Sequence, residues 1–365
     1  MPTQAGLVTT LPAPLPRSQA DAPQLVGLPG ARMLTQRGDD ELVVRRMDGG
    51  SGTVRFPAPW PRRYGTSTVA PDGSLAVFAG VHAVRAVDPA GEVRWEIRHG
   101  CWSGGAACVG SGRMHSAFDE YADDRDHRHA EGGSAGFSAD GRLVWAHIRG
   151  PLPEGPLGTE TVDEWLIIDA ADGRPFVRAD IQAAAAGSEH VPHPDPAQMG
   201  LSIGEGQDGA PLRWGRWDGD DLHIQHFDHA DLVLLGVSPS GDHLMTVNHD
   251  QDTLAVHETK NGSVTATWDA ESTIPPHPET EPDNDEAPLF WDWAGGFVDE
   301  STVIAGTMES DEDWGEGRHW LLRTTGTREP EQLRYPFPVS GIPTALGDGT
   351  WYMVEGDDVH VWTCD

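Results

Sequence analysis

Side chains that bind transition metals gather in one segment of the sequence, residues 99–136. Histidine, cysteine and carboxylate groups are the ligands of zinc and related ions. The segment contains such side chains together with a tryptophan: Cys101, Trp102, Cys108, His115, Asp119, Glu120, Asp123, Asp124, Asp126, His127 and His129. Trp102, His115 and Asp119 are the residues of this segment that we name as candidate ligand contacts.

The spacing inside this segment leaves two interpretations open. Cys101 and Cys108 are seven positions apart, unlike the close cysteine pair of a zinc ribbon. His127 and His129 would face the same side of an extended strand, which suits a shared ligand. Arg125 lies among the acids, however, and can neutralise them without a metal. The segment is therefore either a metal or ligand site or a salt-bridged acidic loop.

The most compact trio of potential metal ligands is His190, His193 and Asp195. Prolines between and beside them restrict the backbone and would hold the three side chains in a fixed geometry. We predict a divalent metal here, and Glu205 and Asp208 in the following glycine-rich turn as ligand contacts. The alternative is a proline-stiffened connection with exposed histidines.

Two other motifs match the sequence pattern of an enzyme site but lack the flanking helix that such a site requires. The pattern 204–209 has the Gly-x-Gly-x-x-Gly spacing of a dinucleotide site, but a strand rather than a helix is expected after it. The pattern 132–136 reads Gly-x-Ser-x-Gly, but it leads into a strand and not into the helix of a nucleophile elbow. Neither motif supports an enzyme.

A recurring phrase organises the rest of the chain. A small residue, then Pro or Ala, then Asp-Gly or Ser-Gly precedes an alternating apolar strand at 70–73, 138–141 and 238–241. Proline presets φ and glycine supplies positive φ, so each phrase predicts a hairpin turn. A second acidic, glycine-containing turn follows each strand, at 88–91, 169–173 and 258–262. Two hairpins per unit predict a four-stranded antiparallel meander.

Seven such units of about 40–50 residues resemble the blades of a WD40-like or quinoprotein-like β-propeller. The Trp-Asp ending of a WD40 blade is present once in the expected place, at Trp268-Asp269. The resemblance implies an all-β, seven-bladed fold in a single domain over 1–365, with residues 6–11 supplying the outer strand of the last blade. The predicted blades are 25–59, 66–100, 134–182, 199–232, 234–269, 293–336 and 341–364, interrupted by acidic insertions at 101–133 and 274–290.

The composition restricts the partners. The chain has 58 Asp+Glu against 25 Lys+Arg, for a formal charge of −33. Such a surface repels nucleic acid and anionic membranes and favours a basic protein partner. No apolar stretch is long enough for a transmembrane helix, and three cysteines are too few for a disulfide framework. We therefore expect a cytoplasmic location.

Two functions follow from these observations. The first is a non-enzymatic propeller that binds a protein partner or a small ligand at the mouth of the channel. The second is a metal-dependent hydrolase, similar to lactonase propellers only in architecture, with an ion that activates water. Its candidate ligands are His190, His193, Asp195 and Glu205, with His115 and Asp119 from the neighbouring insertion. The sequence contains no complete catalytic motif, which favours the first.

Overall fold

The computed structural model describes residues 3–28, 31–47, 52–102, 108, 114–127, 131–150, 163–227, 231–276, 289–309, 318–326 and 329–364. Its regular structure is almost entirely β, with one short helix, α1 (Ala270–Thr273), in these ranges. The chain forms two compact units, a larger one (Pro14–Asp228) and a smaller one (Met1–Ala13 with His229–Asp365). Each is described separately, and the predicted single domain stays a prediction.

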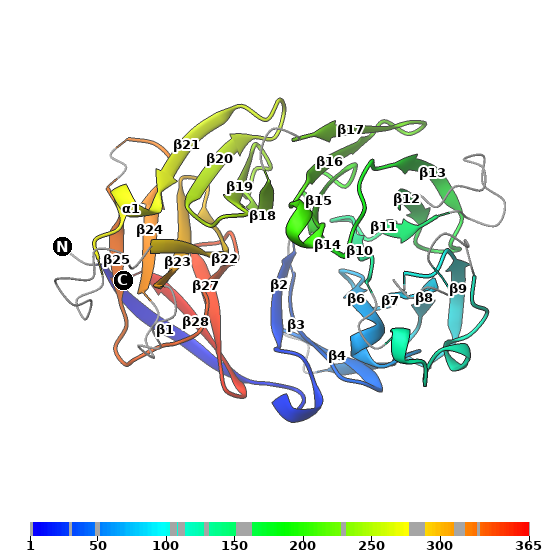
Figure 1. Ribbon diagram of the computed structural model, residues 1–365. Coiled ribbons are helices and arrows are strands. Elements are labelled where there is room, and N and C mark those ends of the chain that lie inside the picture. The colour runs from blue at the N-terminus through cyan, green and yellow to red at the C-terminus, as the bar shows by residue number, and fades with distance from the viewer. Residues whose placement is uncertain are drawn as a thin grey trace. The chain divides into compact units, whose positions relative to one another are not determined.

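The larger unit contains four four-stranded antiparallel sheets, each built from consecutive strands. We call them blades 1 to 4, and Figure 1 shows them from blue to green. Their strands are β2 (Gln24–Leu28), β3 (Ala31–Arg37), β4 (Glu41–Arg46) and β5 (Thr53–Pro57); β6 (Gly65–Val69), β7 (Ala76–Gly80), β8 (Ala83–Val87) and β9 (Val93–Arg98); β10 (Ala135–Phe137), β11 (Leu143–Arg149), β12 (Asp163–Asp169) and β13 (Pro175–Asp180); β14 (Gly187–Pro192), β15 (Gln198–Gly204), β16 (Leu212–Trp217) and β17 (Leu222–His226).

The smaller unit contains blades 5 to 7. Blade 5 is a separate four-stranded sheet, whereas blades 6 and 7 form one eight-stranded sheet because β1 also pairs briefly with β25. The strands are β18 (Leu232–Val237), β19 (His243–Asn248), β20 (Thr253–Glu258) and β21 (Val264–Asp269); β22 (Leu289–Asp299), β23 (Thr302–Glu309), β24 (Arg318–Arg323) and β25 (Glu331–Arg334); β26 (Thr344–Ala345), β27 (Thr350–Glu355), β28 (Asp358–Cys364) and β1 (Thr3–Pro12).

The N-terminal strand completes the last blade, as the sequence predicted. β1 runs antiparallel to β28, from Ala5 opposite Cys364 to Pro12 opposite Asp358, with a bulge between Leu7 and Thr9. β28 would otherwise present an unpaired edge, which is a site for aggregation. The pairing therefore removes an edge by joining two segments from opposite ends of the sequence.

The predicted turns also form where the phrases recur. Gly73, Gly141 and Gly241 have φ of 73°, 72° and 84°, the left-handed region that glycine adopts without steric cost. The strands between these turns bury their apolar side chains against the neighbouring blade. Trp145 and Trp165 of blade 3 pack at 5.2 Å between ring centroids, and a Cβ at Gly215 of blade 4 would lie 2.7 Å from Trp145. That glycine lets two blades approach closely.

Blade 4 begins earlier than the sequence analysis placed it. Residues 187–192, which we interpreted as a connection, form β14, the first strand of that blade, paired with β15. The segment Gly-Ser-Glu-His-Val-Pro lacks the apolar alternation of the other strands, which is why it was missed. Most of the insertion at 274–290 lies outside the described residues. No described helix is long and apolar enough to cross a membrane.

Candidate metal centre

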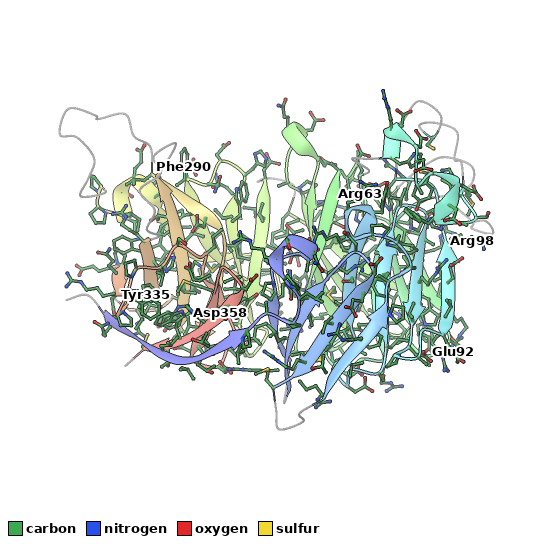
Figure 2. All side chains as sticks on the ribbon, turned by 90° about the horizontal axis from the view of Figure 1, so that it is seen from below. Arg63, Glu92, Arg98, Phe290, Tyr335 and Asp358 are labelled. Atoms are coloured by element: carbon green, nitrogen blue, oxygen red, sulfur yellow. The ribbon has the colours of Figure 1, made fainter. Side chains whose placement is uncertain are left out.

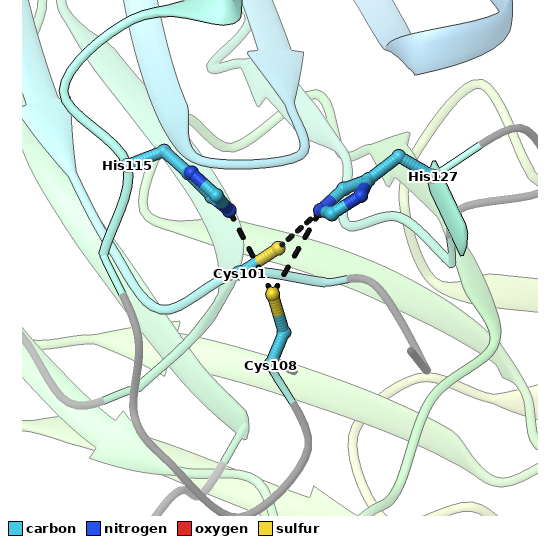
Figure 3. Close-up of side chains that lie close together, drawn as sticks. All are labelled: Cys101, Cys108, His115 and His127. Carbon is cyan, nitrogen blue, oxygen red and sulfur yellow. Dashed lines mark hydrogen bonds between the residues drawn. The ribbon is translucent and has the colours of Figure 1, made fainter. Parts of the chain in front are cut away.

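Two cysteines and two histidines of the insertion after β9 meet in a buried cluster (Figure 3). The Sγ and Nε2 atoms of Cys101, Cys108, His115 and His127 all lie within 4.8 Å of one another. Cys101 Sγ is 3.3 Å from His127 Nε2, and Cys108 Sγ is 3.7 Å from His115 Nε2 and 3.8 Å from His127 Nε2. The histidines are 2% exposed, and the cysteines are 7% and 5% exposed. We call these four residues the Cys–His cluster.

A carboxylate orients each imidazole of the Cys–His cluster. His115 Nδ1 lies 3.2 Å from Glu120 Oε2, and His127 Nδ1 lies 3.1 Å from Asp124 Oδ2. An ionised carboxylate only accepts hydrogen bonds, so each ring donates from Nδ1 to its carboxylate. Nε2 is the atom left to face the thiols, Cys108 for His115 and both cysteines for His127.

Local turns hold these carboxylates in place. The backbone N–H and the hydroxyl of Ser116 both donate to Glu120, at the start of the 3-10 turn Phe118–Glu120. These bonds, with the His115 contact, lower the pKa of Glu120. Asp124 accepts from the backbone N–H of Asp126, which likewise lowers its pKa. Both side chains are thus held as carboxylates at neutral pH.

Tyr121 joins the Cys–His cluster to blade 2. Its ring stacks on His127 with centroids 4.8 Å apart, and its hydroxyl lies 2.6 Å from His82 Nδ1, in the turn between β7 and β8. Burial lowers the pKa of His82 to about 4, so this ring is neutral. Tyr64, just before β6, donates from its hydroxyl to the carbonyl of Ala122. The insertion is thereby packed on one end of blade 2.

The structure brings together part of the set that the sequence predicted in this segment. His115 is a member of the Cys–His cluster, but Asp119 is exposed and Trp102 packs elsewhere, with its ring 5.1 Å from His147 and under the Arg149 guanidinium. His129 lies outside the described residues. The sequence offered one signal that we did not use: an acid five residues after His115 and another three residues before His127.

The predicted trio at blade 4 has other partners. Trp165 donates from Nε1 to His190 Nε2 at 2.9 Å, and His190 Nδ1 lies 2.8 Å from Ser134 Oγ. His193 Nδ1 accepts from the backbone N–H of Asp195 at 2.9 Å, and Asp195 itself accepts from Ala197. Among the described residues, only the Cys–His cluster groups three or more such ligand atoms. A metal at the trio therefore stays a prediction.

The two predicted ligand contacts that follow also lie apart from the Cys–His cluster. Glu205 accepts from the backbone N–H of Ala184 at 2.7 Å, which ties the β15 end to the segment after β13. Asp208 is exposed in the 3-10 turn Gly206–Asp208. Their assignment to a ligand is not tested by these contacts.

A partly buried hydrogen-bonded network surrounds His190. Ser134 Oγ is 2.8 Å from Ser188 Oγ, and Ser188 Oγ is 2.8 Å from His147 Nδ1. The other nitrogen of His147 lies 3.8 Å from Asp163, which also pairs with Arg149 at 2.7 Å. Burial lowers the pKa of both histidines, so both rings are neutral. We call these residues, with Trp165, the Ser–His network.

A groove of about 960 Å³ lies at the other end of blades 2 to 4. The predicted turns build it, because Asp72 and Asp88 lie in the β6–β7 and β8–β9 turns, opposite the β7–β8 turn that touches Tyr121. Figure 2 shows the two ends of blade 2, marked by Arg98 and Glu92. Among the described residues, the groove lining combines acids, apolar side chains and two arginines: Asp72, Asp88, Asp140, Asp169, Leu75, Phe137, Leu143, Phe176, Trp217, Arg94 and Arg142.

The aromatic floor of the groove bridges blades 3 and 4. Phe176 stacks on Trp217 with centroids 5.2 Å apart and an interplanar angle of 30°, and Phe176 is 37% exposed. Asp72 and Asp140 each accept turn hydrogen bonds through Oδ1, from Ser74 and from Arg142 respectively. These bonds fix the direction of the carboxylates at the rim.

The fold, but not the sequence, has known counterparts. No protein-family profile matches the chain, and no curated protein sequence is similar to it. A chain in a crystal structure of the mitotic checkpoint complex aligns with a TM-score of 0.55 at 10% identity, covering 98% of this chain and 91% of that one. The WD40 domain of Neurospora crassa Pan2 aligns with a TM-score of 0.50 at 10% identity, covering 98% and 94%.

Proposed function

The chain has the fold of a WD40-like β-propeller, and we propose that it is a non-catalytic scaffold that binds a protein partner in the groove of blades 2 to 4. The observation that carries this proposal is the lining of the groove. Phe176, which is 37% exposed, stacks on the half-buried Trp217 in a groove that four aspartates also line, in a protein of charge −33. Aromatic anchors surrounded by a polar rim are the usual composition of a binding hot spot.

The charge of the groove lining favours a basic partner over an acidic one. Four aspartates and two arginines line the groove in the described part of the chain, and Arg94 lies 3.7 Å from Asp88. The remaining carboxylates attract lysine and arginine side chains and repel acidic segments. The ligand that fits is therefore a basic peptide segment with an aromatic or aliphatic side chain that packs on Phe176 and Trp217.

The geometry gives less support to the hydrolase alternative. Catalytic zinc sites keep an open coordination position for water, whereas sites with four protein ligands are closed and structural. The Cys–His cluster supplies four ligand atoms and is buried. It resembles a structural site.

Selection of random peptides on immobilised protein tests the proposal. Wild-type protein and a Phe176→Ser/Asp140→Asn variant are panned in parallel, and Phe337→Ser serves as the control because Phe337 is 39% exposed and lies in the smaller unit. We expect basic peptides with an aromatic residue, enriched on the wild type and the control but not on the groove variant. Enrichment of acidic peptides, or equal enrichment on all three proteins, would contradict the proposal.

A further inference from the structure

We propose that Cys101, Cys108, His115 and His127 bind one Zn²⁺ ion with tetrahedral geometry, and that this ion fixes the insertion to blade 2. The site is independent of the proposed partner groove, which lies at the other end of the same blades. The sequence alone did not decide between a metal site and a salt-bridged loop for this segment.

The distances match a zinc site. Zinc binds cysteine sulfur at about 2.3 Å and histidine nitrogen at about 2.0–2.1 Å, so a tetrahedral ion places sulfur and nitrogen about 3.5 Å apart. Three of the four sulfur–nitrogen distances in the Cys–His cluster are 3.3, 3.7 and 3.8 Å, and all four ligand atoms lie within 4.8 Å of one another. The side chains thus already lie at the separation that a shared ion requires.

The chemistry of the donors favours zinc over other common ions. Two thiolates and two imidazoles form the tetrahedral S₂N₂ set that zinc prefers, whereas magnesium and calcium prefer oxygen ligands. Two thiolates also balance the charge of Zn²⁺, so the buried site is neutral overall. The carboxylates of the insertion remain outside this set of four.

Glu120 and Asp124 act on the ion through the histidines. Metal-binding histidines commonly donate their second N–H to a carboxylate, which fixes the tautomer and raises the basicity of the ligand nitrogen. Both histidines have this partner, at 3.2 and 3.1 Å. Two imidazole–carboxylate pairs thus converge on two thiols, which is the arrangement of metal-binding histidines with their outer partners.

The ion would connect the chain after β9 with the turns that carry His115 and His127. Cys101 follows β9 directly, and Tyr121, between the two histidines, contacts His82 of blade 2. The binding of zinc to these residues in the folded state alone stabilises that state by mass action. The expected role is therefore structural.

Metal analysis of the full-length protein tests the proposal. Elemental analysis of protein purified without chelator should find about one zinc per chain. Cys108→Ser and His115→Asn should lose it, whereas Cys364→Ser should retain it, because Cys364 lies in β28. Co²⁺ added to the apoprotein should produce the visible bands of a tetrahedral ion and a thiolate charge-transfer band, both absent in Cys108→Ser. Zinc retained by Cys108→Ser, or no cobalt bands in the wild type, would overturn the proposal.

Milder variants keep the proposal testable if the cysteine and histidine variants do not fold. Glu120→Gln and Asp124→Asn keep all four ligands and should weaken zinc affinity by about 10–100-fold, the usual effect of removing such a carboxylate. Their measured affinity, by competition with a chromophoric chelator, should differ from that of Asp119→Asn, since Asp119 is exposed and has no contact with the four ligands. Equal affinity in all three variants would contradict the assigned role of the carboxylates.

Discussion

The larger unit contains two groups of histidines whose ring nitrogens face different kinds of partner. In the Ser–His network, nitrogen and oxygen atoms meet at 2.8–2.9 Å along the line Trp165, His190, Ser134, Ser188 and His147. In the Cys–His cluster, the inward atoms are two sulfurs and two nitrogens within 4.8 Å of one another, with three sulfur–nitrogen distances of 3.3–3.8 Å. One group is linked by hydrogen bonds between protein atoms, and the other has the spacing of a metal site.

The donor order explains why the Ser–His network needs no ion. Because Trp165 donates to His190 Nε2, the proton of His190 is on Nδ1 and donates to Ser134. Ser134 then donates to Ser188, and Ser188 to His147. Burial would raise the pKa of Asp163, but the His147 contact and the Arg149 charge lower it overall. Burial alone therefore does not mark a functional histidine; the chemistry of its partners does.

Removing the metal should have the largest effect. If the free zinc concentration is about 1,000 times the dissociation constant of the folded chain, removing zinc with a chelator lowers the free energy of unfolding by about 4 kcal/mol. For a unit of this size, that loss corresponds to about 10 °C in Tm. Calorimetry with and without a chelator checks this, and Cys364→Ser should show the same chelator effect as the wild type. An unchanged Tm would contradict the claim that the Cys–His cluster holds a metal while the Ser–His network does not.

A third kind of buried polar group should produce a pH effect. Asp292 in β22 is 5% exposed, and burial raises its pKa to about 6. Because the folded protein then binds its proton more tightly than the unfolded chain does, stability should fall as pH rises from about 4 to about 6, by up to about 3 kcal/mol. Asp292→Asn should remove that part of the pH dependence.

Denaturant titrations of Asp292→Asn at pH 4.5 and pH 8 measure the difference. The variant should gain stability over the wild type mainly at pH 8, and Asp358→Asn, at the exposed first residue of β28, should gain none. An equal change at both pH values would show that Asp292 does not carry the pH dependence.

Breaking the Ser–His network should cost less and should not depend on metal. Ser134→Ala removes the partner of His190 Nδ1 and one of the two partners of Ser188 Oγ, which costs about 1–3 kcal/mol. Ser18→Ala, at an exposed site, is the matched control. Urea unfolding of both variants with and without chelator measures the loss; a chelator-dependent loss for Ser134→Ala would mean that the two groups are coupled.

The groove variant should change stability least. Phe176 is 37% exposed, so Phe176→Ser removes less buried surface than the loss of a core phenylalanine would, together with the stacking on Trp217, and should cost about 1 kcal/mol. Thermal unfolding of Phe176→Ser should therefore show only a small fall in Tm while peptide binding is lost. A large fall in Tm would assign the aromatic pair to the packing of blades 3 and 4.

The repeats could be predicted because each turn is encoded locally. Gly73 and Gly141 follow Asp in a phrase that specifies positive φ, and the strands between the turns alternate regularly. β14 was missed because Pro192 and the polar residues before it read as a loop. The strand forms because β15 supplies the pairing, which is information from outside the segment.

The candidate site was only partly predictable for a related reason. The sequence identified a segment rich in cysteine and histidine but not which members converge, because Cys101 and His127 are 26 positions apart with no regular spacing between the ligand residues. His190 drew attention by its spacing to His193, yet its position in β14 directs it to Ser134 and Trp165. On a regular helix or strand, the spacing in the sequence identifies which potential ligands lie together. In loops, tertiary contacts decide which side chains meet.

X-ray absorption at the zinc edge of the purified, full-length chain tests the central claim most directly. The account predicts bound zinc with two sulfur ligands at about 2.3 Å and two nitrogen ligands at about 2.0 Å, and no water in the coordination shell. A shell of nitrogen and oxygen only, or a sample without zinc, would contradict it.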